Sequence, residues 1–410
     1  MSKDDFLVNA KEGLYSRPSP DLVTKHWRRV VRRRFFLHGI GATGVALTAG
    51  KVFGASSDRL TEGDAALLRF AAAAEIVESD LWQQYNELGG AVKADDSPNS
   101  GNSDYVLALQ NIDGDMPQYI SDNTDDELSH AAFINAYLMM KGEEPVDFTQ
   151  FATFEGSTAT GASGALRLTN LMSLNVDTSW YFRYRSTQNP DQGATFPQLL
   201  NISKQPAIPL APTDPMPGSA IAIPPGTSGP SRVQAMANTA SIHFAFIEQG
   251  GSSLYPILAL KATSLEVLRI LLSIGGVEID HFSLWHDKCG NAISMPLAGT
   301  SDPITGLSFP DFNNAANQHN AQLSKADTAA GSQMFQTNLI LPEPCEFLVP
   351  KVPCSIIRPT LSQNGGPIAA VNGFVADGLF NDPVTGKLNA KFVEKFTDLA
   401  EAANAAKRES

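Results

Sequence analysis

The sequence has few cysteines and no excess of positive charge. Three cysteines among 410 residues are too few for a disulfide framework, and their spacing matches no zinc-binding signature. The net charge of -13 at pH 7 argues against nucleic acid as a partner, because phosphate binding needs clustered Lys and Arg. With 43% hydrophobic residues, the chain can nevertheless fill the core of one large domain or two ordinary ones.

A long apolar run is also missing near the N-terminus, where the sequence has the pattern of an export signal instead. Arg33-Arg34 stands before Phe36-Leu37, and a weakly apolar, glycine-containing run of 12 residues follows at 39–50. Such a run is too short for a permanent membrane span. The segment resembles a twin-arginine signal. We therefore expect residues 1–55 to engage the twin-arginine export machinery and the protein to be periplasmic or extracellular.

Two further features of the sequence are a possible cysteine pair and a formal match to a nucleotide-binding motif. In an oxidising compartment Cys345 and Cys354 could pair, which would leave Cys289 free. The run Gly39-Ile40-Gly41-Ala42-Thr43-Gly44 formally matches the dinucleotide fingerprint, which needs a preceding strand and a following helix. Arginines precede it and no βαβ pattern follows, so no nucleotide cofactor is expected.

Helical periodicity and capping signals predict four long helices between residues 60 and 290. The predicted ranges are Thr61 to Leu88, about Ser121 to Met140, near Pro230 through Glu248, and Thr263 to about Lys288. The fourth begins with a Thr-x-x-Glu capping box. In the third, Gly250-Gly251 follows Glu248, and two glycines weaken a helix, so we expect an end or a bulge there.

The segments outside these helices are predicted to be irregular. Residues 143–228 form a long insertion with one helical piece, Ala165 to Arg185, and then a proline-dense wrapping loop. Residues 291–410 form a mixed, loop-rich C-terminal extension with β-like fragments at 338–341 and 347–357. An amphipathic helix closes the chain from about Asn389 to Lys407. Whether this extension folds alone or packs on the helices stays open.

Two Glu-x-x-His motifs carry the chemistry that the sequence predicts. Glu127 and His130 lie on the second predicted helix, and Glu278 and His281 lie on the fourth. An i,i+3 pair projects from one helical face, so each motif can present a carboxylate and an imidazole to one point. One match would carry little weight, since Glu127 also fits a capping box that begins at Thr124. Two matches on paired helices favour a metal site.

A glutamate on the helix before each motif completes the pattern. Glu78 is followed seven residues later by Tyr85, and Glu248 by Tyr255. Seven residues are two helical turns, so each tyrosine shares the face of its glutamate. Glu75, one turn before Glu78, is an alternative. The expected metal ligands are Glu78, Glu127, His130, Glu248, Glu278 and His281, with Tyr85 and Tyr255 as hydrogen-bonding neighbours, His243 and His286 not assigned as ligands, and no catalytic residue assigned.

This ligand set matches that of di-iron and di-manganese carboxylate bundles, in which two helices each give a Glu and two each give a Glu-x-x-His. Four carboxylates offset the charge of two divalent ions, and two neutral imidazoles add donors without adding charge. Mixed oxygen and nitrogen ligands favour iron or manganese over a thiophilic metal or calcium. They do not choose between iron and manganese.

The chain resembles ferritin-like proteins, and more narrowly the desiccation-related ferritin-like proteins that carry a twin-arginine signal. The stretches that carry the resemblance are Ala72 to Trp82, Asp126 to Ala131 and Leu168 to Met172. It covers roughly residues 60–290 and implies a mainly α fold, a ferritin-like four-helix bundle with a long insertion. It also implies that Glu127 and Glu278 bridge the two metal ions, that Glu78 and Glu248 are terminal ligands, and that each histidine binds one ion.

Two functions are therefore expected from the sequence. The first is an oxidoreductase, catalase-like or di-iron, that uses two iron or manganese ions in redox chemistry on oxygen or peroxide. The alternative is a non-enzymatic metal-binding or desiccation-protection protein on the same scaffold, because a fold does not determine a function. A third is a bundle whose polar core is only structural. The sequence is compatible with an oligomer and does not define the substrate.

Overall fold

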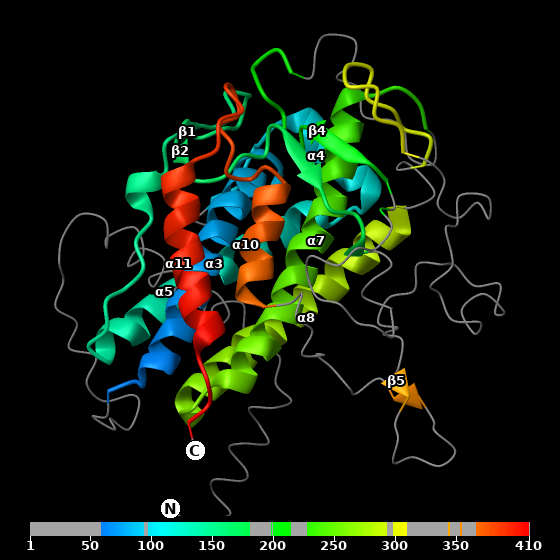
Figure 1. The fold of residues 1–410 in the computed structure, drawn as a ribbon. Coiled ribbons are helices and arrows are strands. Elements are labelled where there is room, and N and C mark those ends of the chain that lie inside the picture. Colours follow the sequence, from blue (N-terminus) through cyan, green and yellow to red (C-terminus); the bar gives the residue numbers. More distant parts are fainter. Residues whose placement is uncertain are drawn as a thin grey trace, which may run out of the picture. The chain divides into compact units, whose positions relative to one another are not determined.

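The structure is a computed structural model that describes residues 59–93, 97–180, 198, 200–214, 228–292, 298–309, 343–344, 353–354 and 366–409. The chain divides into two units, residues 1–56 with 94–97 and the remainder. The first unit, which holds the expected export signal, lies almost wholly outside the described residues. Within the second unit the described chain is mainly helical (Figure 1). Among the described helices, none has the length and apolarity needed to cross a membrane.

Four long helices form the centre of the second unit. They are α3 (Glu62–Gly89), α5 (Met116–Met140), α7 (Arg232–Lys261) and α8 (Leu265–Ala292). Helix α3 packs along α5, and α7 packs along α8. The four lie side by side in Figure 1, with α10 and α11 in front of them.

Contacts along the helices give their directions. Arg69 pairs with Glu143, whereas the Thr124 hydroxyl donates to the Trp82 carbonyl, so α3 and α5 are antiparallel. Helix α7 is also antiparallel to α3, since Glu75 meets Tyr255 while Tyr85 meets His243. The pairs Tyr137 with Glu266 and Asn123 with Trp285 make α8 antiparallel to α5. The middle turns of all four helices therefore face one another.

Polar side chains cap these helices and join their ends. Thr61 is the N-cap of α3, where its hydroxyl accepts a hydrogen bond of 3.0 Å from the Asp64 backbone N–H. The Asp64 carboxylate in turn accepts the backbone N–H groups of Thr263 and Ser264 at 2.8 and 2.9 Å. This carboxylate therefore ties the start of α3 to the start of α8.

The predicted boundaries of the second and fourth long helices differ from the structure. Helix α5 begins at Met116, because Pro117 occupies its first turn, where proline is tolerated. Thr124 therefore lies inside the helix, where its hydroxyl donates to the Ile120 and Trp82 carbonyls, and it caps nothing. In α8 the capping side chain is Ser264, which accepts the Val267 N–H at 3.1 Å, and the helix starts at Leu265.

The sequence predicted that helix α7 would end or bulge at Gly250-Gly251, and this prediction is wrong. The helix continues to Lys261 through Pro256, and it is buried along nearly its whole length. Tertiary packing on every side outweighs a cost of about 1 kcal/mol per glycine.

The insertion packs on the long helices through short elements. They are η1 (Thr149–Phe151), β1 (Phe154–Glu155) paired with β2 (Leu166–Arg167), and β3 (Leu174–Val176) paired with β4 (Ile202–Gln205), both pairs antiparallel. Over residues 165–179 the strands β2 and β3 replace the predicted helix, whose last residues, 181–185, lie outside the described residues. Short apolar runs do not distinguish a strand from a helix by periodicity alone.

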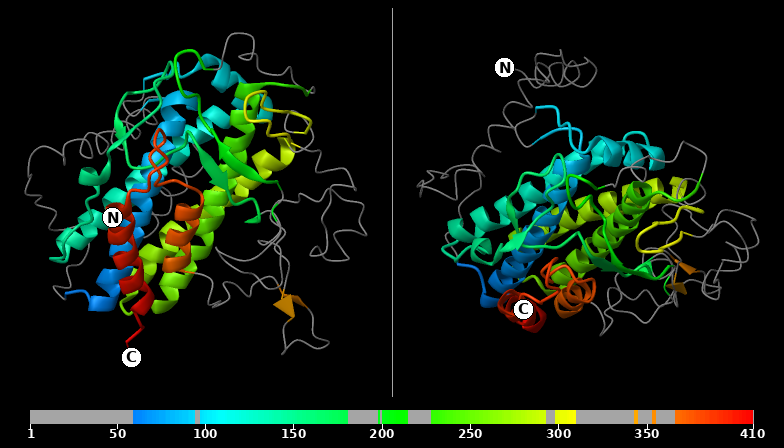
Figure 2. Two further views of the ribbon diagram at one scale, coloured as in Figure 1. Left: turned by 45° about the horizontal axis from the view of Figure 1, so that its top comes forward. Right: turned by 90° about the horizontal axis from the view of Figure 1, so that it is seen from above.

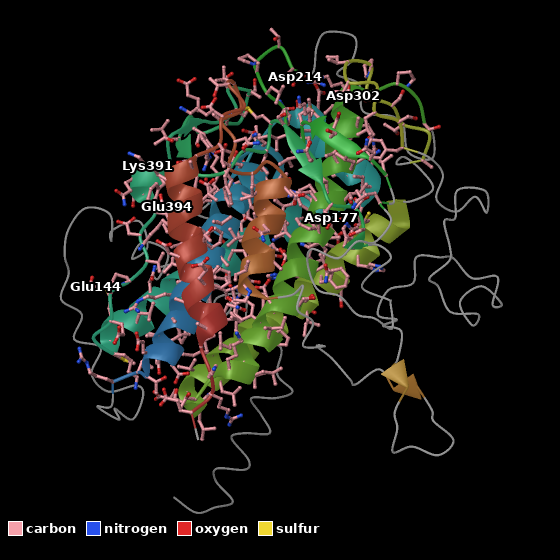
Figure 3. The ribbon with its side chains drawn as sticks, in the orientation of Figure 1. Glu144, Asp177, Asp214, Asp302, Lys391 and Glu394 are labelled. Atoms are coloured by element: carbon pink, nitrogen blue, oxygen red, sulfur yellow. The ribbon has the colours of Figure 1, made fainter. Side chains whose placement is uncertain are left out.

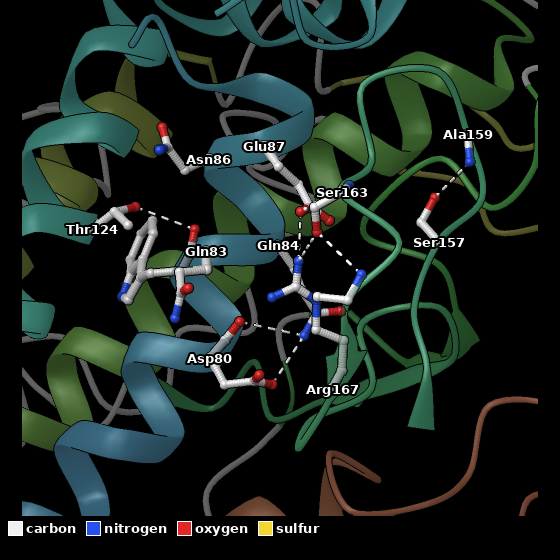
Figure 4. A network of polar contacts seen from close by, with 12 residues as sticks. Asp80, Gln83, Gln84, Asn86, Glu87, Thr124, Ser157, Ala159, Ser163 and Arg167 are labelled. Carbon is white, nitrogen blue, oxygen red and sulfur yellow. Dashed lines mark hydrogen bonds and ion pairs between the residues drawn. The ribbon is translucent and has the colours of Figure 1, made fainter. Parts of the chain in front are cut away.

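A polar network fixes this part of the insertion to α3 (Figure 4). The Asp80 carboxylate accepts the backbone N–H and the hydroxyl of Thr169 at 2.8 and 2.7 Å, and the Gln84 amide donates to the same hydroxyl at 2.8 Å. Arg167 pairs with Glu87 one turn further along. Two acidic side chains of α3, Asp80 and Glu87, therefore bind residues of the insertion.

Helix α4 (Ser103–Ile112), which the sequence analysis missed, packs on α7. Its N-cap Asn102 accepts the Tyr105 N–H at 3.1 Å. Asn102 lies between the first two predicted helices, where the sequence pattern predicted no helix.

The described C-terminal residues form one strand pair and two helices, and the helices pack on the long helices. The elements are β5 (Glu343–Pro344) paired with β6 (Pro353–Cys354), α10 (Pro367–Ala376) and α11 (Ala390–Ala405). Helix α11 begins after its cap Asn389, as predicted, and lies along α3 (Figure 2). Phe396 of α11 stacks on Phe70 of α3. The pairing of Cys345 with Cys354 lies outside the described side chains, and Cys289 is buried and free.

Candidate metal centre

Six side chains from the four long helices converge in two overlapping groups that can hold a metal ion. The group that we call the His130 site contains Glu75, Glu127, His130 and Glu278, and the group that we call the His281 site contains Glu127, Glu248, Glu278 and His281. Within each group the potential ligand atoms lie within 4.8 Å of one another. Glu127 and Glu278 belong to both groups.

The two histidines point the same ring nitrogen into the cluster. Nδ1 of His130 lies 3.2 Å from Glu127, 3.3 Å from Glu75 and 3.5 Å from Glu278. Nδ1 of His281 lies 3.1 Å from Glu127 and 3.2 Å from Glu248. Each Glu-x-x-His motif therefore presents both of its side chains to one point, as the i,i+3 spacing predicts.

The cluster is enclosed by protein. Glu75, Glu127 and Glu278 have no exposed surface, and the histidines retain 8% and 6% of theirs. The carboxylates lie deepest, so the small remaining access to solvent is on the imidazole side.

Helix α3 contributes Glu75 to the groups, whereas the sequence analysis preferred Glu78. Glu78 lies one turn away and is also buried, close enough to Glu75, Glu127 and Glu248 for their charges to act on it. The preference rested on a tyrosine seven residues later. In the structure the aromatic residue at that spacing from Glu75 is Trp82, so a search for any aromatic residue there would have kept Glu75.

The two tyrosines have different roles. The Tyr255 hydroxyl donates to the Glu75 carboxylate across the interface of α3 and α7. The Tyr85 hydroxyl instead lies 2.7 Å from Nδ1 of His243. Tyr255 therefore contacts the cluster directly, while Tyr85 belongs to a separate buried pair.

Four residues that the sequence analysis did not assign complete the surroundings of the cluster. The Trp82 indole N–H donates to Glu248 at 3.1 Å, and the Asn123 amide donates to Glu127 and Glu248 at 2.8 and 3.1 Å. Trp285 donates to the Asn123 oxygen at 2.7 Å, and Asp126 accepts from Nε2 of His281 at 3.2 Å. Helical spacing marks some of them, since Asn123 is one turn before Glu127 and Trp82 is two turns after Glu75.

Mutual proximity and burial shift the ionisation of the whole cluster. Burial and the Glu127 charge raise the pKa of Glu75 to about 8, although His130 opposes the shift. Burial and the neighbouring carboxylates raise the pKa of Glu278 and of Glu78 well above the usual range. Burial lowers the pKa of His130, but Glu75 and Glu127 outweigh it and raise the value to about 10.

Glu127 and His281 shift in the directions that favour charge. Burial alone would raise the pKa of Glu127, but hydrogen bonds and charges from His130 and His281 hold it below its usual range. The surrounding carboxylates, Glu248 first, raise the pKa of His281 against the effect of burial. In the metal-free chain the cluster therefore gathers protons to offset buried negative charge.

These residues fit a metal ion by two independent observations. One oxygen of Glu75 and both oxygens of Glu278 are buried without a hydrogen-bond partner among the described residues. Such groups are costly unless something satisfies them, and a cation would do so. The donors are carboxylate oxygens and imidazole nitrogens, the set that iron and manganese accept.

A glycine makes room for the shared carboxylate of Glu278. A Cβ at Gly251 would lie 2.2 Å from Oε2 and 3.0 Å from Cδ of Glu278. Any larger residue there would displace this carboxylate. Gly251, one of the two glycines that were predicted to weaken α7, therefore allows the close approach of α8.

The other buried histidines lie outside the metal groups found among the described residues. Burial lowers the pKa of His243 to about 3, so this ring is neutral beside Tyr85. His286 packs edge-on against Trp180, with ring centroids 5.9 Å apart.

The fold and the site thus define a mainly helical protein with a buried cluster of glutamates and histidines that can hold a metal ion. Comparisons with protein-family models, with curated proteins and with solved structures find no match for this chain.

Proposed function

We propose that this chain is a ferritin-like protein whose four long helices hold a dinuclear iron or manganese centre for redox chemistry on oxygen or peroxide. The observation that carries the proposal is the sharing of Glu127 and Glu278 by two buried ligand groups. Two groups with two carboxylates in common suit a pair of ions bridged by those carboxylates. Each ion then has one further glutamate and one histidine of its own.

Charge balance supports two divalent ions. The two groups contain four different carboxylates, Glu75, Glu127, Glu248 and Glu278, and two imidazoles. Two divalent ions offset four negative charges in a buried site. The fifth carboxylate, Glu78, belongs to neither group, and in the metal-free chain burial and the nearby carboxylates raise its pKa.

The chain's residues would bind, orient and shield the metal pair. Tyr255 and Trp82 hold the two outer glutamates, and Asn123 holds Glu127 and Glu248 together. The stack of Trp82 on Trp285 and Phe244 lies beside the glutamates and excludes water from that side. When bound, iron or manganese would supply the redox change and the Lewis acidity that these side chains lack.

The proposal is tested by metal analysis of natively purified protein. The wild type should contain about two equivalents of iron or manganese, the number that the shared-ligand set implies. The variant Glu127→Ala/Glu278→Ala should lose both, because each ion loses two ligands. The matched control is Glu144→Ala/Glu394→Ala, which removes two exposed glutamates (Figure 3).

The control variant should keep both equivalents. A wild type that contains no metal after native purification, and that takes up none on incubation with ferrous or manganous ion, contradicts the proposal. That result would leave the cluster as a structural polar core.

Turnover separates the two functional alternatives. A fully metallated sample that consumes peroxide or oxygen, with activity lost in Glu127→Ala/Glu278→Ala, identifies an oxidoreductase. Full metallation without turnover of either identifies the non-enzymatic metal-binding or desiccation-protection protein.

Export in the folded state is part of the proposal. The arginine pair and the weakly apolar run of residues 39–50 favour the twin-arginine route, which carries folded cargo. A buried metal cluster could then be loaded before export. Replacement of Arg33-Arg34 by Lys-Lys should retain the protein in the cytoplasm, and fractionation of cells would show it.

A further inference from the structure

The two metal sites share two ligands but differ in the hydrogen bonds that support them. The two groups pair Glu127 and His130 with Glu278 and His281, and pair Glu75, which replaces Glu78 of the sequence pattern, with Glu248, so the two halves form an internal repeat. Under this alignment Trp82 corresponds to Tyr255, and each of them donates to the outer glutamate of the opposite half. The repeat is therefore symmetric at the ligands and at these two donors.

The symmetry ends at Asp126. This residue precedes Glu127, and its carboxylate accepts from Nε2 of His281 at 3.2 Å. The residue that precedes Glu278 is Val277, which cannot accept a hydrogen bond from a histidine. Among the described residues no hydrogen bond to Nε2 of His130 is found, so only one imidazole is held at both nitrogens.

Asn123 adds a second difference. Its amide donates to Glu248 and to Oε1 of Glu127, the oxygen that faces His281, and Trp285 fixes the orientation of this amide. One turn before Glu278 the repeat has Ile274, which is apolar. In the His130 site one oxygen of Glu75 has no hydrogen-bond partner.

We infer that the two metal sites are inequivalent and load in order, with the His281 site first and more tightly. This inference rests on the proposed dinuclear site. Ligands that are held in place before binding lose less conformational freedom when the ion arrives. A carboxylate behind a ligating histidine also orients the ring and raises its basicity. Asp126 is the positioning residue that makes the difference, through His281.

The experiment is a titration of metal-free, full-length protein with manganous ion, in which electron paramagnetic resonance measures the free ion. The wild type should bind two equivalents in two steps. Partners of a ligating histidine typically change metal affinity by about 10–100-fold, so Asp126→Ala should weaken the first step by about that factor. The second step should change much less, and Asp126→Asn, which keeps an acceptor, should lie between.

Two further variants assign the steps to the sites. His130→Ala should keep the tight first equivalent and lose the second, whereas His281→Ala should lose the tight one. The control Asp280→Asn removes an exposed carboxylate next to His281 that makes no hydrogen bond or ion pair in the described structure, and both steps should be unchanged. In the reverse direction, Val277→Asp should tighten the second step.

The outcomes separate this inference from the proposed function. Two equivalents bound with equal affinity, or equal weakening of both steps by Asp126→Ala, overturns the ordered loading and leaves the dinuclear centre intact. A wild type that binds no manganese overturns both. Retention of the tight equivalent in His281→Ala also overturns the inference, because it places the first ion in the other site.

Discussion

At the scale of single residues, the absence of a side chain at Gly251 matters as much to the candidate site as the contacts of its neighbours. Gly251 lies in the middle of α7, where glycine weakens a helix, and a Cβ there would meet the Glu278 carboxylate at 2.2 Å. The atom that it would meet is the end of a flexible side chain, so the fold can adapt by moving it. The candidate metal site cannot adapt in this way, because both groups include that carboxylate.

Gly251→Ala should therefore keep the fold and damage metal binding. We expect metal affinity to fall about tenfold or more, the effect typical of a displaced ligand environment, while the metal-free protein keeps its helical circular dichroism. The control is Gly276→Ala, where an added Cβ meets nothing within 4 Å. That change should leave metal affinity alone and stabilise α8 by about 0.5–1 kcal/mol. Equal affinity in the two variants would show that Glu278 tolerates displacement.

At this scale the sequence predicts that glutamates and histidines form the candidate site, but it does not predict every residue that takes part. The i,i+3 spacing places Glu127, His130, Glu278 and His281 together because it depends only on helix geometry. The choice between Glu75 and Glu78 depends on how α3 is rotated against α7, which is set by packing of residues far apart in the chain. The role of Asp126 is equally hard to predict from the sequence, because its partner His281 lies 155 positions away in the chain.

At the scale of elements, α11 shows how the C-terminal extension contributes to the core. Phe396 stacks on Phe70 of α3 with ring centroids 5.6 Å apart, and lies 6.1 Å from the Phe380 ring and 6.2 Å from that of Phe148. Its side chain is fully buried. Since α3 carries Glu75, the aromatic cluster also supports the helix that forms part of the candidate metal centre.

Phe396→Ala should destabilise the protein by about 3–5 kcal/mol, the usual cost of removing a buried phenylalanine. Urea unfolding followed by circular dichroism would measure it. Lys395→Ala, on the exposed side of the same helix, should change the free energy of unfolding by less than about 0.5 kcal/mol. A small effect of Phe396→Ala would mean that α11 does not unfold together with α3.

Amphipathic helices are easier to predict from the sequence than helices that are buried on all sides. Helix α11 begins after Asn389 as predicted, because one apolar face and a capping side chain mark it. Helix α7 is buried on nearly all sides, so its periodicity is weak and its C-terminal half was not recognised. The two strands that replace the predicted helix near residue 165 are set by distant partners such as Asp80, which a local pattern cannot contain.

At the scale of the whole molecule, the core combines a polar cluster with a neutral buried pair. His243 is fully buried and its ring contacts are Tyr85, at 2.7 Å through a hydrogen bond, and Phe246. Burial lowers the pKa of His243 from 6.5 to about 3. The folded state therefore keeps this ring neutral at pH values where the unfolded chain protonates it.

The sign of the resulting pH dependence follows from proton binding. Between pH 6.5 and about 3 the unfolded state carries a proton on His243 that the folded state lacks. The contribution of His243 to stability is therefore complete above pH 6.5 and is lost as the pH falls towards 3. Within that window it should change by about 1.4 kcal/mol per pH unit.

His243→Gln should remove this part of the pH dependence. Glutamine can still accept the Tyr85 hydroxyl but does not titrate, so its free energy of unfolding should fall less steeply with acid than that of the wild type. Urea unfolding of both proteins between pH 6.5 and 4.5, with chelator present to keep the metal centre empty, gives the difference in slope. Tyr85→Phe is the control, because it removes the hydrogen bond and leaves His243 to titrate, so it should lower stability and keep the wild-type slope. Parallel curves for wild type and His243→Gln would mean that the buried ring is protonated in the folded state, and the neutral pair would then be wrong.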